Sequence, residues 1–281
     1  MSWRIAIGHT TTHRYAHEVS SSYNEARILP LTLARQICLE ARVEVQPAAR
    51  TYSYWDYWGS AVTAFDIHVP HTELVVHGTS LVETSPPPAS WDTTTWADLA
   101  APPTVDKFAE FMAPTTYVPR AIDGLSEAIE ELRGAPSPAN AARGAVGWTR
   151  DRLRYQAGAT DVHTSAVDAL AKGEGVCQDF VHLTLALLRG LGIPSRYVSG
   201  YLHPSPDAAV GETVIGQSHA WLEWWCGDWV AFDPTHGVAV GERHVVVARG
   251  RDYADVAPLK GIYQGAPAVA HTVEVQLTRT G

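Results

Sequence analysis

The chain has 281 residues, 46% of them hydrophobic and 18% charged, so it can bury a substantial core in one large domain or two smaller ones. Its formal net charge of −9 argues against nucleic acid and against an anionic membrane surface as natural partners. No stretch approaches the ~18 apolar residues of a membrane span, and the first residues contain no apolar signal run. Together with three irregularly spaced cysteines, which do not form a disulfide framework, these features predict a reduced, cytoplasmic protein.

Residues 1 to about 84 show the patterns of β-strands. Strands are expected at 3–15, 37–45, 64–69 and 73–77, separated by proline and glycine. This pattern indicates a mostly antiparallel β domain, arranged as a sandwich. Three consecutive prolines at 86–88 cannot continue a central strand and mark residues 85–90 as a linker. We therefore place an N-terminal β domain at 1–90 and a second domain at 91–281.

The second domain begins with helices and ends with strands, which is an α+β pattern. The helix expected at 177–189 is apolar on nearly every face and should be buried on most sides. Further helices are expected at 105–112, 124–132, 140–154 and 165–171. Strands are expected at 196–202, 219–225, 229–232, 243–249 and 269–277.

A glycine-rich loop at 173–175 leads into the apolar helix, and Cys177 stands at or near its first position. The free N–H groups and the positive end of the helix dipole at such a position favour the thiolate, which is the nucleophilic form of cysteine. A small buried residue that opens a core helix would give the same pattern. This stretch alone leaves both interpretations open.

The predicted hairpin at 219–232 supplies two more candidate groups. If residues 226–228 form a three-residue loop, Trp225 pairs with Trp229. His219 and Asp233 are then diagonal neighbours on one face of the sheet, ~7–8 Å apart at the backbone. A loop one residue shorter or longer would place them on opposite faces.

A cysteine, a histidine and an aspartate in these positions match the needs of acyl transfer by a thiol. The histidine takes the thiol proton and returns it to the leaving amine, and the aspartate orients the imidazole. The backbone N–H of Cys177 can help to hold the oxyanion. Alone, His219 suggests an ordinary hydrogen-bonded strand residue and Asp233 a turn residue; their occurrence together with Cys177 favours a catalytic triad.

Three sequence blocks in this order resemble the transglutaminase-like superfamily: 175–180 (GVCQDF), 218–221 (SHAW) and 233–237 (DPTHG). The similarity extends to 191–201 and 250–256, and residues 22–27 resemble the β-rich N-terminal region of bacterial members. The resemblance implies a papain-like core with a central helix packed on an antiparallel sheet. It also implies Cys177 as nucleophile, His219 as general base and acid, and Asp233 as the orienting group, with no cofactor.

The resemblance leaves the reaction open, because members of this family include transamidases, cysteine peptidases, peptide N-glycanases and inactive proteins. No acidic cluster resembles the calcium sites of animal transglutaminases. We therefore expect a cysteine hydrolase of amide or isopeptide bonds in a peptide or protein. The alternatives are a transamidase of the protein-glutamine γ-glutamyltransferase kind and a non-catalytic binding module; the intact triad speaks against the last.

Four further residues are candidates around the predicted nucleophile. Asp179 is expected to turn away from the thiol and support a loop. For the others a substrate or oxyanion contact competes with a structural role: a core position for Tyr155 and Trp221, and a solvent-facing helix position for Gln178. Histidines in the N-terminal domain at first suggest a metal, but i and i+4 ligands on a strand lie too far apart for one ion, so no metal site is expected; they are His9, His13, His17, His68, His71 and His77.

Overall fold

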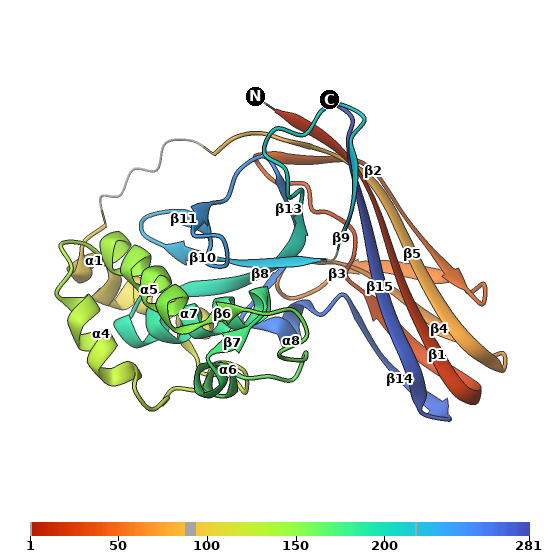
Figure 1. Cartoon of the computed structure of the whole chain (residues 1–281), viewed down its shortest axis with the longest axis horizontal. Helices are drawn as coiled ribbons and strands as arrows, with labels where there is room; N and C mark the ends of the chain where they lie inside the picture. Colours follow the sequence, from red (N-terminus) through yellow and green to blue (C-terminus); the bar gives the residue numbers. More distant parts are fainter. Residues whose placement is uncertain (1, 88–93, 217) are drawn as a thin grey trace.

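A computed structural model describes residues 2–87, 94–216 and 218–281. It has the expected α+β architecture, with a long, curved antiparallel sheet on one side and a helix-rich core built on a second sheet on the other (Figure 1). Part of the predicted linker, residues 88–90, lies outside the described residues.

The first sheet is organised around β1 (Trp3–Ala26), a strand of 24 residues. The first half of β1 pairs with β5 (His71–Thr84) and β15 (Ala268–Arg279), and its second half pairs with β4 (Ala61–Ile67) and β14 (Leu259–Gly265). Because β1 runs through both halves, all eight strands belong to one hydrogen-bonded sheet. The predicted sandwich of separate sheets is therefore wrong. The remaining strands of this sheet are β2 (Gln36–Gln46), β3 (Thr51–Trp55) and β9 (Thr213–Gly216).

The last two strands of the chain return to the N-terminal sheet. β15 pairs with β1 from Ile5 opposite Arg279 to Tyr15 opposite Ala268, and β14 pairs with the end of the same strand. We expected the strand at 269–277 to close the sheet of the second domain, and this assignment is wrong. Local periodicity identifies a strand but does not identify its partner. The division into domains 1–90 and 91–281 stays a prediction. Residues 91–281 contribute strands to both sheets.

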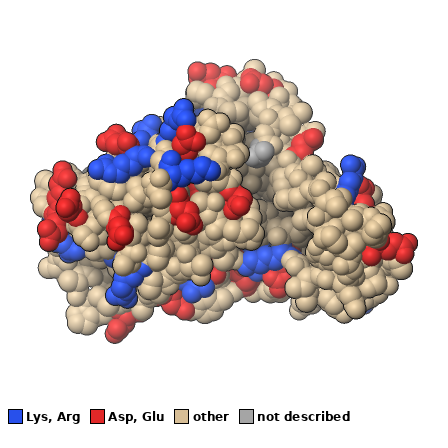
Figure 2. Space-filling view, turned by 60° about the horizontal axis from the view of Figure 1, so that its bottom comes forward, with Lys and Arg blue, Asp and Glu red and all other residues tan. Residues whose placement is uncertain are grey.

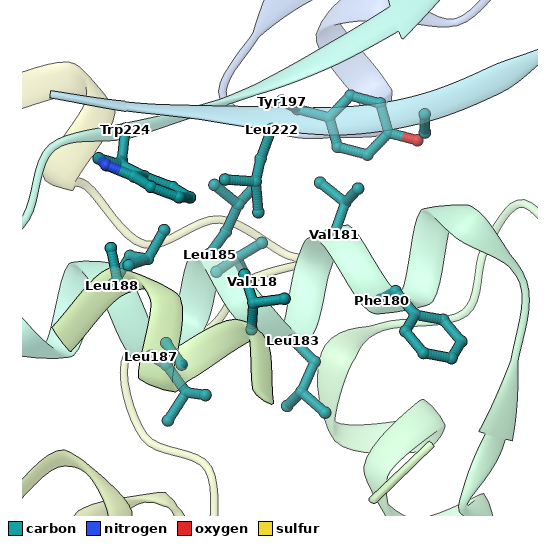
Figure 3. Close-up of a cluster of buried hydrophobic side chains, with 14 of the residues drawn as sticks. Val118, Phe180, Val181, Leu183, Leu185, Leu187, Leu188, Tyr197, Leu222 and Trp224 are labelled. Carbon is teal, nitrogen blue, oxygen red and sulfur yellow. The ribbon is translucent and has the colours of Figure 1, made fainter. Parts of the chain in front are cut away.

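The core is built on α7 (Cys177–Leu191), which is buried along nearly its whole length as expected. In Figure 3, Tyr197, Leu222 and Trp224 point from the sheet toward α7, while Leu183 and Leu187 point to its other side. Helices pack there as well, so α7 is covered by the sheet on one side and by helices on the other. The other helices are α1 (Trp96–Ala100), α2 (Pro102–Lys107), α3 (Ala109–Met112), α4 (Leu125–Arg133), α5 (Pro138–Arg152), α6 (Ala166–Lys172) and α8 (Tyr253–Val256).

The core sheet has the strand order β12-β11-β10-β8-β13. One face packs on α7, and the other packs on residues that follow β1, with Trp221 and Val198 against Leu31. These strands are β8 (Ser195–Leu202), β10 (His219–Trp225), β11 (Trp229–Asp233), β12 (Val238–Ala239) and β13 (His244–Gly250); two short strands, β6 (Arg154–Tyr155) and β7 (Glu174–Gly175), pair beside the start of α7.

Most predicted elements are present with shifted ends. The single helix expected at 105–112 is two short helices, α2 and α3, that meet at Phe108. The strands β3, β6, β7, β9, β12 and β14 and the helices α1 and α8 were not predicted. None of the described helices combines the length and the apolar character needed to cross a bilayer. Acidic and basic side chains are interspersed on the face shown in Figure 2, where a recess lies between the core on the left and the N-terminal sheet on the right.

Candidate active site

Cys177 is the first residue of α7 and is partly exposed, as a nucleophile must be. The same turn contains Asp179, which is fully buried. Its Oδ2 accepts hydrogen bonds from the Thr160 hydroxyl at 2.6 Å and from the Val176 N–H at 2.7 Å. Asp179 thus joins the helix start to the loop before α6. Burial raises the pKa of its carboxyl despite these hydrogen bonds.

Gly175 is needed for this arrangement because the Asp179 side chain occupies the space of a Cβ. A Cβ built on Gly175 would lie 2.6 Å from Asp179 Cβ and 2.7 Å from Asp179 Oδ2. The glycine of the predicted loop is therefore explained by a close approach between the loop and the first turn of α7.

The predicted hairpin register is confirmed. Trp225 pairs with Trp229, and Leu222 pairs with Phe232, across a loop in which Gly227 has a φ of 86°. This register places His219 and Asp233 on the same face. His219 Nε2 lies 2.7 Å from Asp233 Oδ2. Because a carboxylate can only accept, Nε2 carries the proton, and Nδ1 is the nitrogen left for the thiol.

The His219 ring also interacts with the Cys177 side chain, so the thiol, the imidazole and the carboxylate lie next to one another. Burial alone would lower the pKa of His219, but the hydrogen bonds to Asp233 and Cys177 outweigh it and raise this pKa to about 10. The imidazole is therefore held in its charged form across neutral pH.

Asp233 is fully buried and has more partners than the predicted triad requires. His236 Nδ1 lies 2.7 Å from the same Oδ2, and His244 Nε2 lies 3.5 Å from it. The other oxygen, Oδ1, accepts from the backbone N–H of Thr235 at 2.9 Å. Burial would raise the pKa of Asp233, but the hydrogen bonds from the histidines hold it far below its usual range.

His236 and His244 had no predicted role, although a signal for the first was present. An aspartate that caps its own turn brings residue i+3 close to its carboxylate, and His236 is that residue. His244 begins β13, and its approach to Asp233 depends on tertiary packing.

His219, Asp233 and His236 also form the one cluster in the described parts of the chain that could hold a metal ion. Their ligand atoms lie within 4.8 Å of one another. Imidazole and carboxylate are suitable zinc ligands, but these atoms already satisfy each other by hydrogen bonds. The hydrogen bonds explain the cluster without a metal.

The three other residues that were candidates for contact with substrate or the oxyanion differ in their exposure. Tyr155 is 56% exposed and pairs with Gly175, and burial together with the nearby Cys177 raises its pKa. Gln178 is buried, with its Nε2 3.4 Å from the carbonyl of Val162, so the solvent-facing alternative is wrong. Trp221 is fully buried behind His219, a position that gives a substrate no access to it. Only Tyr155 combines exposure with proximity to Cys177.

Five of the six N-terminal histidines have separate partners. His9 is buried and joins the two sheets, with Nδ1 2.9 Å from the Tyr201 hydroxyl. His77 lies 2.8 Å from the Thr10 hydroxyl, and His68 pairs with Asp66 at 2.7 Å. His71 approaches a backbone carbonyl, and His13 stacks on His271.

Family models match two segments of the chain, together more than half of its length. Residues 126–234, which include Cys177, His219 and Asp233, match the transglutaminase-like superfamily. Residues 5–83 match the bacterial transglutaminase-like N-terminal region.

The chain is also similar to individual proteins along part or all of its length. The chain is 47% identical over 278 residues to an uncharacterised protein of Mycobacterium leprae, covering 99% of both. It is 33% identical over 103 residues to a protein-glutamine γ-glutamyltransferase of Pseudomonas aeruginosa, covering 33% of this chain and 15% of that protein. Its fold is similar to that of a Cytophaga hutchinsonii protein described provisionally as a cysteine protease, with a TM-score of 0.76, 22% identity and coverage of 99% and 98%. On these matches, the chain belongs to the transglutaminase-like superfamily.

Proposed function

We propose that the protein is a cysteine-dependent acyl-transfer enzyme that hydrolyses amide or isopeptide bonds of a peptide or protein. One observation carries the proposal: a partly exposed cysteine at the start of a buried helix contacts a histidine that is hydrogen-bonded to a buried aspartate. This arrangement provides a nucleophile, a proton carrier and an orienting group in contact with one another.

In the proposed reaction, the Cys177 sulfur attacks the carbonyl carbon while the His219 imidazolium holds the former thiol proton. The developing oxyanion is stabilised by N–H groups at the start of α7, and the exposed Tyr155 hydroxyl is a second candidate donor. His219 gives its proton to the leaving amine as the C–N bond breaks, which leaves a thioester. Water then loses a proton to His219 as it attacks the thioester, and the acid and the thiol are released.

A transamidase is the second candidate, because the matched segment of the Pseudomonas protein belongs to a protein-glutamine γ-glutamyltransferase. The two reactions share the thioester and differ only in whether water or an amine resolves it. A binding module without catalysis is the third candidate. Neither nucleic acid nor a membrane is proposed as a partner, and a cytoplasmic location stays a prediction.

The test uses the purified protein and a glutamine-containing peptide, with and without a primary amine. Release of acid in both reactions supports the hydrolase, whereas amine incorporation that exceeds acid release would replace it with the transamidase. Cys177→Ala should lower the rate at least about a thousandfold. If Cys177→Ala retains the rate, the proposed nucleophile is wrong, and if the native protein releases no acid and incorporates no amine across a peptide library, the binding module is favoured.

A further inference from the structure

A cavity of about 290 Å³ lies behind the triad, on the face of the core sheet that turns away from α7. Trp221, Glu223 and His244 line one side, and residues 33–36 with Thr84 and Ser85, from the N-terminal part of the chain, line the other. Neither Cys177 nor His219 is among its lining residues. The cavity is therefore separate from the surface on which the triad cysteine opens.

The walls of this cavity carry surplus positive charge. Glu223 is buried, and both of its oxygens are engaged by Arg249 at 3.0 Å, while Arg196 also pairs with it at 2.5 Å. One carboxylate neutralises only one of these two largely buried guanidinium groups. The ring of Trp229 holds Arg196 in place, with the guanidinium 3.8 Å from the ring centre.

A third guanidinium, that of Arg35, lines the same cavity from the N-terminal segment. Within the part of the chain that the structure describes, Arg35 forms no ion pair. Its nearest charged neighbours are Glu223, which is already paired, and Asp228, which lies at the exposed hairpin loop. The lining thus holds three positive and two negative groups.

Trp221, one of the lining residues, also carries a buried donor without an acceptor. The indole N–H of Trp221 is inaccessible to solvent and has no hydrogen-bond partner among the described residues. Buried polar groups in native proteins are nearly always paired, so each exception points to a missing partner or a cost to stability. Since this nitrogen is closed to solvent, the observation that points to a ligand is the surplus of guanidinium groups, which requires an acceptor that carries negative charge.

We propose that this cavity binds a small oxyanion, namely the carboxylate or phosphate group of a metabolite-sized molecule. The planar guanidinium fork suits both groups, because it donates two parallel hydrogen bonds to a pair of oxygens. A volume of about 290 Å³ is at the lower end of small-molecule sites, which excludes a large ligand. The anion would balance the surplus charge that the protein buries between its two sheets.

An anion bound in the cavity would affect the triad through two residues that contact both. Trp221 lines the cavity and also packs near His219, with ring centres 6.2 Å apart. His244 lines it as well and approaches Asp233 Oδ2. The site is thus placed to act as an effector site for the acyl-transfer reaction, although binding itself does not depend on that reaction.

Isothermal titration calorimetry of the full chain tests the proposal, with succinate and inorganic phosphate in separate titrations at constant ionic strength. We expect saturable binding of at least one of them with one site per chain. Arg35→Gln should weaken it at least tenfold, since this exposed side chain can be changed without disturbing the core. The matched control is Arg42→Gln, whose side chain is 74% exposed and pairs with Glu44 on the same sheet. It should bind as the native protein does.

A steric variant tests the location independently of charge. Gly241 lines the cavity, and nothing lies within 4 Å of a Cβ added there, so Gly241→Leu should fold and fill part of the cavity. It should abolish binding while its melting temperature stays close to that of the native protein. The proposal is overturned if neither anion binds at 50-fold higher concentration than the protein, or if binding persists unchanged in both Arg35→Gln and Gly241→Leu. Because binding is measured directly, this result is independent of whether the protein hydrolyses any peptide.

Discussion

At Asp233, one carboxylate oxygen accepts hydrogen bonds from two imidazoles at 2.7 Å and lies 3.5 Å from a third. A buried carboxylate with this many donors stays ionised, because each donor stabilises its charge where water cannot. The same charge then stabilises the His219 imidazolium. The raised pKa of His219 thus depends on its two partners, Asp233 on the hairpin and Cys177 on α7, rather than on the histidine alone.

Replacing this carboxylate should move the alkaline limit of the activity. In Asp233→Asn the imidazolium loses its charged partner, so the pKa of His219 should fall from about 10 toward its ordinary value of 6.5. The alkaline limb of the kcat/KM profile should move to lower pH with it, and the rate at neutral pH should fall by about 100-fold or more. Asp66→Asn is the matched control, because it breaks an exposed histidine–aspartate pair and should leave the profile unchanged.

The same pKa predicts how stability changes with pH. A histidine whose pKa is raised in the folded state adds stability that is fully present below pH 6.5 and is lost as the pH rises to about 10. Denaturant unfolding should therefore show that the free energy of unfolding of the native protein falls between pH 7 and pH 10. The fall should be smaller in Asp233→Asn. An equal loss in both proteins would mean that Asp233 does not hold the imidazolium.

The three cysteines should differ in their rates of alkylation. Cys226 is 3% exposed, and burial raises the pKa of Cys38, whereas Cys177 is partly exposed and contacts an imidazole that can take its proton. Iodoacetamide followed by peptide mass spectrometry should modify Cys177 first at pH 7. In His219→Ala, the alkylation of Cys177 should slow to about the rate at which Cys38 is alkylated. Modification of Cys38 ahead of Cys177 in the native protein would argue against an activated thiol.

At the scale of elements, the close approach of β7 to the start of α7 fixes the position of the cysteine. Asp179 holds Val176 and Thr160 from within the first turn, and Gly175 makes room for its side chain. The start of α7, and with it Cys177, is therefore tied to two preceding segments, the residue before the helix and the loop that contains Thr160. A shift of this turn would move the sulfur relative to His219.

Gly175→Ala should lower both stability and activity for this reason. The added methyl group would lie 2.6 Å from Asp179 Cβ, so the turn must move, at a cost of about 1–3 kcal/mol in the free energy of unfolding. Gly147→Ala is the control: it lies in α5 with open space around an added Cβ and should gain about 0.5–1 kcal/mol. The free energy of unfolding and kcat/KM should be measured on both variants. If Gly175→Ala is as active as the native protein, the turn tolerates displacement.

At the scale of the whole molecule, the N-terminal sheet supports the back of the core sheet. Gln36 is buried at this junction: its amide N–H groups donate to the carbonyls of Leu31 and Val246 at 2.7 Å, and its oxygen accepts from the Val246 N–H at 2.7 Å. Nearby, the Tyr201 hydroxyl donates to the carbonyl of Ile28 and lies beside His9. The two bodies thus share buried polar contacts as well as the strands at the end of the chain.

Gln36→Leu should therefore destabilise the whole molecule. The substitution leaves the Val246 N–H and the Leu31 carbonyl without their side-chain partner, which should cost at least about 2 kcal/mol. Gln276→Leu, at an exposed position on β15, is the control and should change the free energy of unfolding by less than about 0.5 kcal/mol. Thermal and denaturant unfolding of both variants checks this, and equal stabilities would show that the junction contributes little.

Features that depend on residues close together in the chain were determined by the sequence itself. Strand and helix periodicity located α7 and most strands, and the three-residue loop at 226–228 fixed the hairpin register that brings His219 to Asp233. In each case the geometry follows from contacts a few residues apart, so the local pattern contains the necessary information.

Only the tertiary structure decided which distant segments meet. The pairing of β15 with β1 joins residues about 250 to 275 positions apart, and the approach of His244 to Asp233 depends on how β13 packs. Likewise, Trp221 shares the His219 face, but its burial follows from the N-terminal segment that covers that face. The alternation of residues along a strand predicts which face of the strand is buried. Which segment covers that face depends on how the complete chain packs.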